Sequence, residues 1–160
     1  MHKKILSLVV IFICSTFALL AQTITDGGYY YLRNRQTGKF LTGGNNYGTN
    51  LCLHETGLDF RVDKTTNGYT FYSGIYNSND RNYLNASSNS LDGAANPFTL
   101  VDKGNGYFTI QDASTNNKGY LYADNNTIEF RTQEPSNNHS AYQWEFLTKT
   151  DLIDELKGAT

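Results

Sequence analysis

The chain has 160 residues, with 13 basic and 15 acidic side chains and a formal net charge of −2. This balance argues against nucleic acids and anionic membranes as partners, because both are bound through clusters of Lys and Arg that the sequence lacks. Its length is that of one domain.

The segment 1–21 differs from the rest of the chain. Residues 2–4 are basic, residues 5–21 are mostly apolar, and Ala21-Gln22 offers a small-residue cleavage point. We expect a secretory signal peptide, and hence a secreted or cell-envelope protein. A membrane anchor is the alternative, although a spanning helix needs about 20 strongly apolar residues. Cleavage removes two lysines and no acid, which changes the formal charge from −2 to −4.

Cys52 is the only cysteine after residue 21, so the mature chain cannot form an intrachain disulfide. The remaining 139 residues must be held together by their hydrophobic core, and this length is sufficient for one.

Apolar and polar residues alternate with a period of two from Tyr29 to Thr148, which is typical of half-buried strands. The pattern predicts four strands in each of three copies of about 40 residues. The expected strands are 28–33, 39–43, 50–55 and 58–63, then 69–73, 82–86, 89–93 and 97–102, then 106–112, 119–123, 127–132 and 142–147.

Each copy repeats the same three features in the same order. The openings are Gly28-Tyr29, Gly68-Tyr69 and Gly106-Tyr107; the aromatic-leucine pairs are Phe40-Leu41, Tyr83-Leu84 and Tyr120-Leu121; the closing aromatics are Phe60, Phe98 and Trp144. Such repetition predicts pseudo-threefold symmetry. Twelve strands in three equal groups need a closed arrangement that hides their edges.

Four segments have the residue types that tolerate positive φ in turns. They are Gly43-Gly44-Asn45-Asn46, Asn67-Gly68, Asn105-Gly106 and Asp124-Asn125-Asn126. Beyond residue 148 the period changes, and residues 151–158 predict a short helix capped by Thr150 or Asp151. We therefore interpret residues 149–160 as a C-terminal helix or linker.

The phrase Tyr31-Leu32-Arg33-Asn34, followed by Thr37-Gly38-Lys39-Phe40-Leu41, resembles the opening of ricin-B-like lectin modules. The resemblance covers residues 26–148 and implies an all-β β-trefoil over residues 22–148. In that fold six strands form a barrel and six form hairpins at one end of it. The signal segment also resembles those of trefoil modules in secreted Bacteroidota proteins. The resemblance implies carbohydrate binding, with a glycan or polysaccharide as partner.

The chain departs from the sugar-binding pattern of that family. Ricin-type repeats place an Asp directly after the leucine of the second strand, but the residues found there are Thr42, Asn85 and Tyr122. The family's Gln-x-Trp signature is also altered, because Gln143 is adjacent to Trp144. Galactose binding in the ricin manner therefore does not follow.

A different sugar site remains possible, because trefoil loops vary around a rigid frame. Sugars need a flat aromatic face and planar amide or carboxylate partners, which the third copy and its loop 133–141 offer. The candidate ligand-binding residues are Tyr122, Asp124, Asn126, Arg131, Asn138, Asn85, Asn46 and Tyr47. In the alternative interpretation these asparagines form turns and the tyrosines pack at the barrel rim.

Catalysis and metal binding have little support, so we expect a non-catalytic protein without cofactor or metal. Cys52 and His54 lack a third orienting group, and Glu129 with Asp124 is the only carboxylate pair worth weighing. The segment 112–119 resembles a calcium loop, but its glycine comes two places late. Two alternatives to a lectin stay open: a protein-interaction trefoil such as a protease inhibitor, acting through loop 133–141 or 43–50, and a structural accessory domain of a larger secreted protein.

Overall fold

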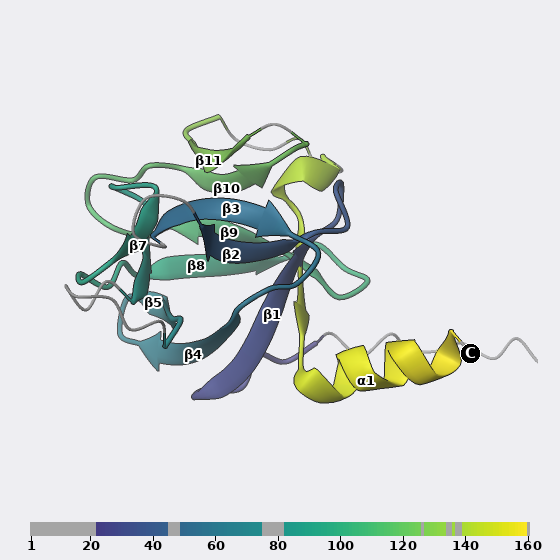
Figure 1. The fold of residues 1–160 in the computed structure, drawn as a ribbon. Helices are drawn as coiled ribbons and strands as arrows, with labels where there is room; N and C mark the ends of the chain where they lie inside the picture. The colour runs from purple at the N-terminus through teal and green to yellow at the C-terminus, as the bar shows by residue number, and fades with distance from the viewer. Residues whose placement is uncertain are drawn as a thin grey trace, which may run out of the picture.

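Six strands close into a barrel in the computed structural model, which describes residues 22–44, 49–74, 82–125, 127–133, 136 and 139–159 (Figure 1). Each pairs with the next around the ring, and the last pairs with the first. In ring order they are β1 (Gly28–Asn34), β4 (Asp59–Thr65), β5 (Gly68–Tyr72), β8 (Phe98–Asp102), β9 (Tyr107–Asp112) and β12 (Trp144–Leu147). The closed ring leaves these strands no free edge.

The other six strands form three hairpins, each attached to the first barrel strand of its repeat. They are β2 (Phe40–Gly44) with β3 (Asn50–His54), β6 (Tyr83–Asn85) with β7 (Ser90–Asp92), and β10 (Tyr120–Ala123) with β11 (Ile128–Arg131). The Asn89 side chain joins two hairpins: its Nδ2 donates to the Ile128 carbonyl at 3.0 Å, and its Oδ1 accepts from the Phe130 amide at 3.2 Å. The predicted all-β trefoil is confirmed.

The strand register defines which residues are related by the pseudo-threefold symmetry. Tyr30 pairs with Phe60, Tyr69 with Phe98, and Phe108 with Trp144. Tyr69 is therefore equivalent to Tyr30 and Phe108. The prediction that the three Gly-Tyr openings correspond is wrong by one residue in the second copy, because Gly68, and not Tyr69, occupies the position of Tyr29 and Tyr107.

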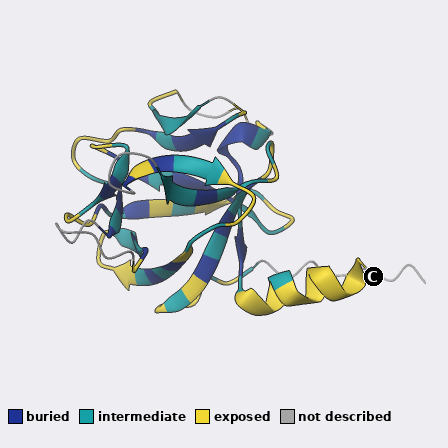
Figure 2. Ribbon diagram, in the orientation of Figure 1, coloured by how far each residue is buried: buried dark blue, intermediate teal, exposed yellow. Residues whose placement is uncertain are grey.

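The core is built by the residues that recur in all three copies. The three closing aromatics and the leucines of the aromatic-leucine pairs are all 0% exposed. Phe71 lies at the centre, with ring contacts to Phe60, Phe98 and Phe146 at centroid distances of 6.4, 5.5 and 6.0 Å. Figure 2 shows buried positions alternating with more exposed ones along the barrel strands, as a sheet closed around one core requires.

The turns agree with the sequence in two places and differ in one. Asn105 and Gly106 both have positive φ, of 56° and 79°, and Gly68 has φ 131°. Gly43 and Gly44 do not form the predicted turn, because β2 continues through Gly44, which pairs with Asn50 of β3. The next residues, 45–48, lie outside the described part of the chain, as does the predicted signal segment 1–21.

Helix α1 (Lys149–Gly158) follows the barrel and projects from it (Figure 1). Its N-cap is Thr148 rather than Thr150 or Asp151, because Thr148 and Asp151 form a reciprocal capping box. The helix has no buried residue, and Arg33 of β1 holds it through Glu155, at 2.7 and 2.8 Å. None of the helices in the described residues has the length and apolar character to span a membrane.

Candidate functional site

The β10–β11 hairpin brings three of the predicted site residues together. The Tyr122 hydroxyl donates a hydrogen bond to Asp124 Oδ2 at 2.6 Å. The Arg131 guanidinium carbon lies 3.5 Å from the centroid of the Tyr122 ring, and Arg131 Nε donates to Glu129 Oε1 at 2.6 Å. Tyr122 and Glu129 are cross-strand partners, so all four side chains belong to one small cluster.

The ring of Tyr122 is covered by its neighbours. Besides Arg131 over its face, Tyr142 of the short helix η2 (Ser140–Tyr142) packs at a centroid distance of 5.0 Å, and His139 lies at 6.3 Å. Tyr122 is only 8% exposed. The flat sugar platform expected in this copy is therefore not provided by the Tyr122 face; the residue acts by holding Asp124.

The electrostatics of the Tyr122–Asp124 pair keep the phenol protonated as a donor and leave the carboxylate as the acceptor. The hydrogen bond to Asp124 raises the pKa of Tyr122, and burial and the Asp124 charge raise it further, whereas Arg131 opposes the shift. A phenol that donates to a carboxylate keeps its proton, because ionisation would place two negative charges side by side. Tyr122 is thus a neutral donor, and Asp124 is held in one orientation.

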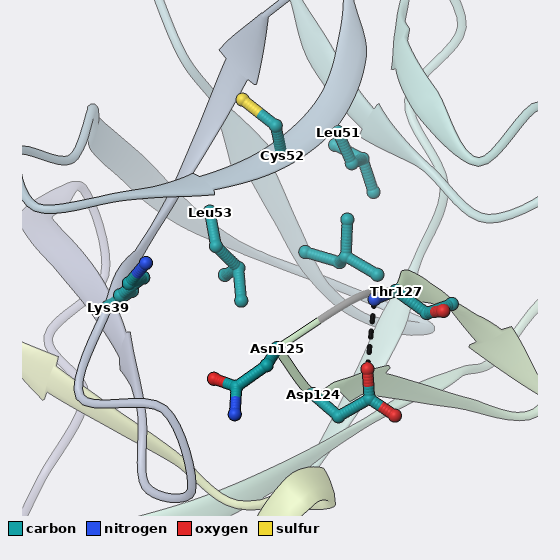
Figure 3. A pocket seen from close by; sticks show the side chains of 8 residues that line it. Lys39, Leu51, Cys52, Leu53, Asp124, Asn125 and Thr127 are labelled. Atoms are coloured by element: carbon teal, nitrogen blue, oxygen red, sulfur yellow. Dashed lines mark hydrogen bonds between the residues drawn. The ribbon is translucent and has the colours of Figure 1, made fainter.

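Asp124 also lines a pocket of about 200 Å³ between the turn after β10 and strand β3 (Figure 3). Its Oδ1 accepts from the Thr127 amide at 2.9 Å. Polar ends come from Lys39, Asp124, Asn125 and Thr127, and the apolar lining from Leu51, Leu53 and Ile128. The site therefore combines a fixed acceptor, cationic and amide donors, and an aliphatic surface in a space for a small ligand.

Cys52 belongs to the pocket wall, but its sulfur points away from the other lining side chains (Figure 3). The sulfur packs at Gly44, where an added Cβ would meet it at 2.5 Å. Burial raises the pKa of the Cys52 thiol, which keeps it protonated and a weak nucleophile. His54 instead bonds to Thr56, so Cys52 and His54 do not form a dyad.

Asn85 lies away from this cluster, in the second copy. It is 6% exposed, its Nδ2 donates to the Ala94 carbonyl at 2.9 Å, and its Oδ1 accepts from the Ser88 amide at 3.1 Å. Its amide group therefore organises a turn. The other four predicted site residues, Asn126, Asn138, Asn46 and Tyr47, lie outside the described residues. The loops 133–141 and 43–50, on which an inhibitor function depends, are described only in part.

The segment that resembles a calcium loop is a turn organised by one buried carboxylate. Asp112, 1% exposed, accepts from the amides of Ser114 and Lys118 at 2.9 and 2.7 Å. Its oxygens are thus used within the turn. Among the described residues, no group of three or more His, Cys, Asp or Glu side chains is placed to hold a metal ion.

Sequence reasoning did not find Lys39 or the β3 leucines as parts of the pocket. Lys39 precedes the first aromatic-leucine pair and is far from Asp124 along the chain. Only the packing of the first hairpin against the third brings them together, and no local pattern reports such a contact. Leu51 and Leu53 have the alternate spacing of any half-buried strand, so the sequence pattern does not indicate that they line a pocket.

No protein-family model matches the sequence, and no curated protein matches it. A solved structure described as a salivary protein from Culex quiquefasciatus of the Cysteine and Tryptophan-Rich (CWRC) family is similar, with TM-score 0.55, 13% identity, and coverage of 81% of this chain and 99% of that chain. A designed 3-fold symmetric protein, ThreeFoil, has TM-score 0.52, 18% identity, and coverage of 77% and 99%. At these identities the likeness shows the fold alone.

Proposed function

We propose that this protein is a secreted, non-catalytic carbohydrate-binding β-trefoil module, functionally akin to the ricin-B-like modules of secreted Bacteroidota proteins. Residues 1–21 would direct export. The observation that carries the proposal is the Asp124 carboxylate, fixed by Tyr122 and by the Thr127 amide at the edge of a pocket of about 200 Å³.

The pocket suits the two chemical sides of a sugar ring. Hydroxyls donate well to a charged carboxylate, and Asp124 is already oriented, so binding need not order it. Lys39 and Asn125 supply donors to the hydroxyl oxygens, while Leu51, Leu53 and Ile128 offer aliphatic surface to the ring's C–H groups. We assign Asp124 the role that the Asp after the second-strand leucine has in ricin-type repeats, although Asp124 lies two residues further along.

The test is binding of the mature chain to a glycan array, followed by calorimetry on the best soluble saccharide. We expect Asp124→Asn to weaken binding at least tenfold, because it removes the charge while keeping the shape. The matched control is Asp59→Asn, which changes an exposed acid on β4. Silence of the wild type across the array, or equal affinities for Asp124→Asn and wild type, would contradict the proposal.

A further inference from the structure

A line of aromatic and charged side chains crosses the outer face of four neighbouring strands. Tyr29 of β1 pairs with Arg61 of β4, Arg61 with Tyr72 of β5, and Tyr72 with Tyr83 of β6. Cross-strand partners point to the same face of a sheet. Their chain neighbours Tyr30, Phe60, Phe71 and Leu84 are buried. We call Tyr29, Arg61, Tyr72 and Tyr83 the tyrosine row.

Cross-strand pairing and side-chain contacts connect the row. Arg61 is the cross-strand partner of Tyr29, and the Arg61 guanidinium carbon lies 5.2 Å from the centroid of Tyr72. The rings of Tyr72 and Tyr83 are 5.2 Å apart. Asp63 fixes the guanidinium by accepting from Arg61 Nε at 2.9 and 3.0 Å. The row is therefore an ordered surface rather than a set of independent side chains.

The fold itself does not require this row. The positions equivalent to Tyr72 and Tyr83 are Arg33 and Phe40 in the first copy, and Gln111 and Tyr120 in the third. Only the second copy has two adjacent aromatics there. In the first copy Arg33 is engaged by α1, and in the third Tyr120 packs on Tyr142 at 6.5 Å. Because only one copy of three has this row, we infer that the row has a role other than packing of the shared core.

We propose that the tyrosine row is a second carbohydrate-binding surface, and that it takes an extended neutral polysaccharide chain; this rests on the proposed function. Strands are about 4.7–4.9 Å apart, so the four strands of the row span about 14 Å, longer than one sugar ring. Tyr29 is 57% exposed and Tyr72 and Tyr83 are half-buried, so aromatic surface is accessible to sugar C–H faces.

The charges of the row favour a neutral chain over an anionic one. Arg61 is already paired with Asp63 at 2.9 Å, and Tyr83 has Asp92 as its cross-strand partner. No uncompensated cation remains in this set to attract an acidic polysaccharide, whereas the carboxylates can accept from hydroxyls.

The row is also separate from the Asp124 pocket, since β10 and β11 lie at the top of Figure 1 and β4 at the bottom. The module would then hold one glycan at two places.

The experiment is co-sedimentation of the mature chain with four insoluble neutral polysaccharides: cellulose, xylan, chitin and starch granules. We expect the wild type to sediment with at least one of them. Tyr72→Ala/Tyr83→Ala should raise the apparent Kd at least tenfold, and Tyr29→Ala several-fold. The matched control is Tyr107→Ala, because Tyr107 is also half-buried under a guanidinium, that of Arg35 at 4.6 Å, but lies outside the row.

Folding is checked by thermal unfolding, and Tyr29→Ala keeps the test valid if the double variant is unstable, because that ring is mostly exposed. Sedimentation of the row variants at the wild-type level, or of the wild type with none of the four polysaccharides, overturns the inference. Loss in the row variants with retention in Asp124→Asn supports it. If Asp124→Asn weakens the binding of short saccharides and the row variants change no binding, the proposed function stands and this inference is wrong.

Discussion

Threefold-related positions have similar residues on the inner face of the barrel and different residues on its outer face. At threefold-related positions the inner face has the same kind of residue each time, such as the aromatics Phe60, Phe98 and Trp144, all fully buried. On the outer face, one such set is Arg33, Tyr72 and Gln111, which share neither charge nor shape. The inner positions are constrained by close packing, whereas the outer ones are not.

This difference indicates where binding specificity resides. Each outer position has acquired separate contacts: Arg33 holds α1, Tyr72 joins the tyrosine row, and Gln111 lines a pocket of about 210 Å³ with Tyr120. A rigid shared core allows such divergence, because it positions the strands whatever the outward side chains are. Variants at Phe71, Tyr29, Tyr122 and Glu155 test how far the two faces are independent.

The largest expected effect is on the inner face. Phe71→Ala removes the ring that packs on Phe60, Phe98 and Phe146, and we expect the free energy of unfolding to fall by about 3–5 kcal/mol. Chemical denaturation monitored by circular dichroism measures this. Tyr29→Ala on the outer face should change it by less than about 0.5 kcal/mol. Similar losses for both variants would break the distinction between the faces.

A smaller effect is expected at Tyr122, which is buried but belongs to the candidate site. Tyr122→Phe deletes the hydrogen bond to the Asp124 carboxylate, and we expect a loss of about 1.5 kcal/mol in the free energy of unfolding. Ligand affinity should fall as well, because Asp124 loses the orienting hydrogen bond from the Tyr122 hydroxyl. An unchanged affinity with lowered stability would assign Tyr122 to the core alone.

The pH dependence of that variant gives an independent check. The pKa of Tyr122 is raised in the folded state, chiefly by the bond to Asp124, so its stabilising contribution is complete below the unfolded pKa of about 10. The contribution is lost as the pH rises through the higher folded pKa. The stability difference between wild type and Tyr122→Phe should therefore shrink above pH about 10. A difference independent of pH would contradict the assigned bond.

Local patterns are sufficient to predict the strands and their threefold repetition, whereas the trefoil arrangement is implied by the resemblance to a known family. Alternation and turn residues placed all twelve strands within two residues of their observed bounds. The errors have local causes too: the sequence predicts a turn at Gly43 and Gly44, but β2 runs through them, and it predicts Thr150 or Asp151 as the N-cap, but the N-cap is Thr148. A glycine pair permits a turn but does not impose one when a strand partner is available.

The candidate site was predictable only where it lies within one hairpin. Tyr122, Asp124 and Arg131 belong to one hairpin of the third copy and its turn, so their convergence follows from local pairing. Lys39 reaches the pocket from another copy, and the tyrosine row combines four strands whose register the Gly-Tyr openings misplace by one residue. Such arrangements depend on barrel closure. The sequence pattern predicts that the strands close into a barrel, but it does not predict which outward side chains lie side by side.

The smallest expected effect is at the first copy's outer face, where Arg33 joins the barrel to α1. Glu155 receives two hydrogen bonds from Arg33, and these lower its pKa, which burial partly opposes. The contact is therefore complete above the ordinary pKa of about 4.5 and is lost as the pH falls through the lower folded value. The Glu155 side chain is 46% exposed, so the contact contributes about 0.5 kcal/mol or less.

Glu155→Gln should therefore loosen α1 at neutral pH while leaving the barrel's unfolding midpoint almost unchanged. NMR relaxation of the α1 amides measures this, and lowering the pH through the folded-state pKa of Glu155 should have the same effect on the wild type. The control is Asp154→Asn, because Asp154 pairs with Lys157 within the helix, at 3.1 Å. Equal loosening in both variants would mean that the helix's own stability, and not its contact with Arg33, sets its position. A fixed α1 in Glu155→Gln would mean that Leu152 and Leu156, which line an apolar groove with Tyr31 and Phe40, hold it instead.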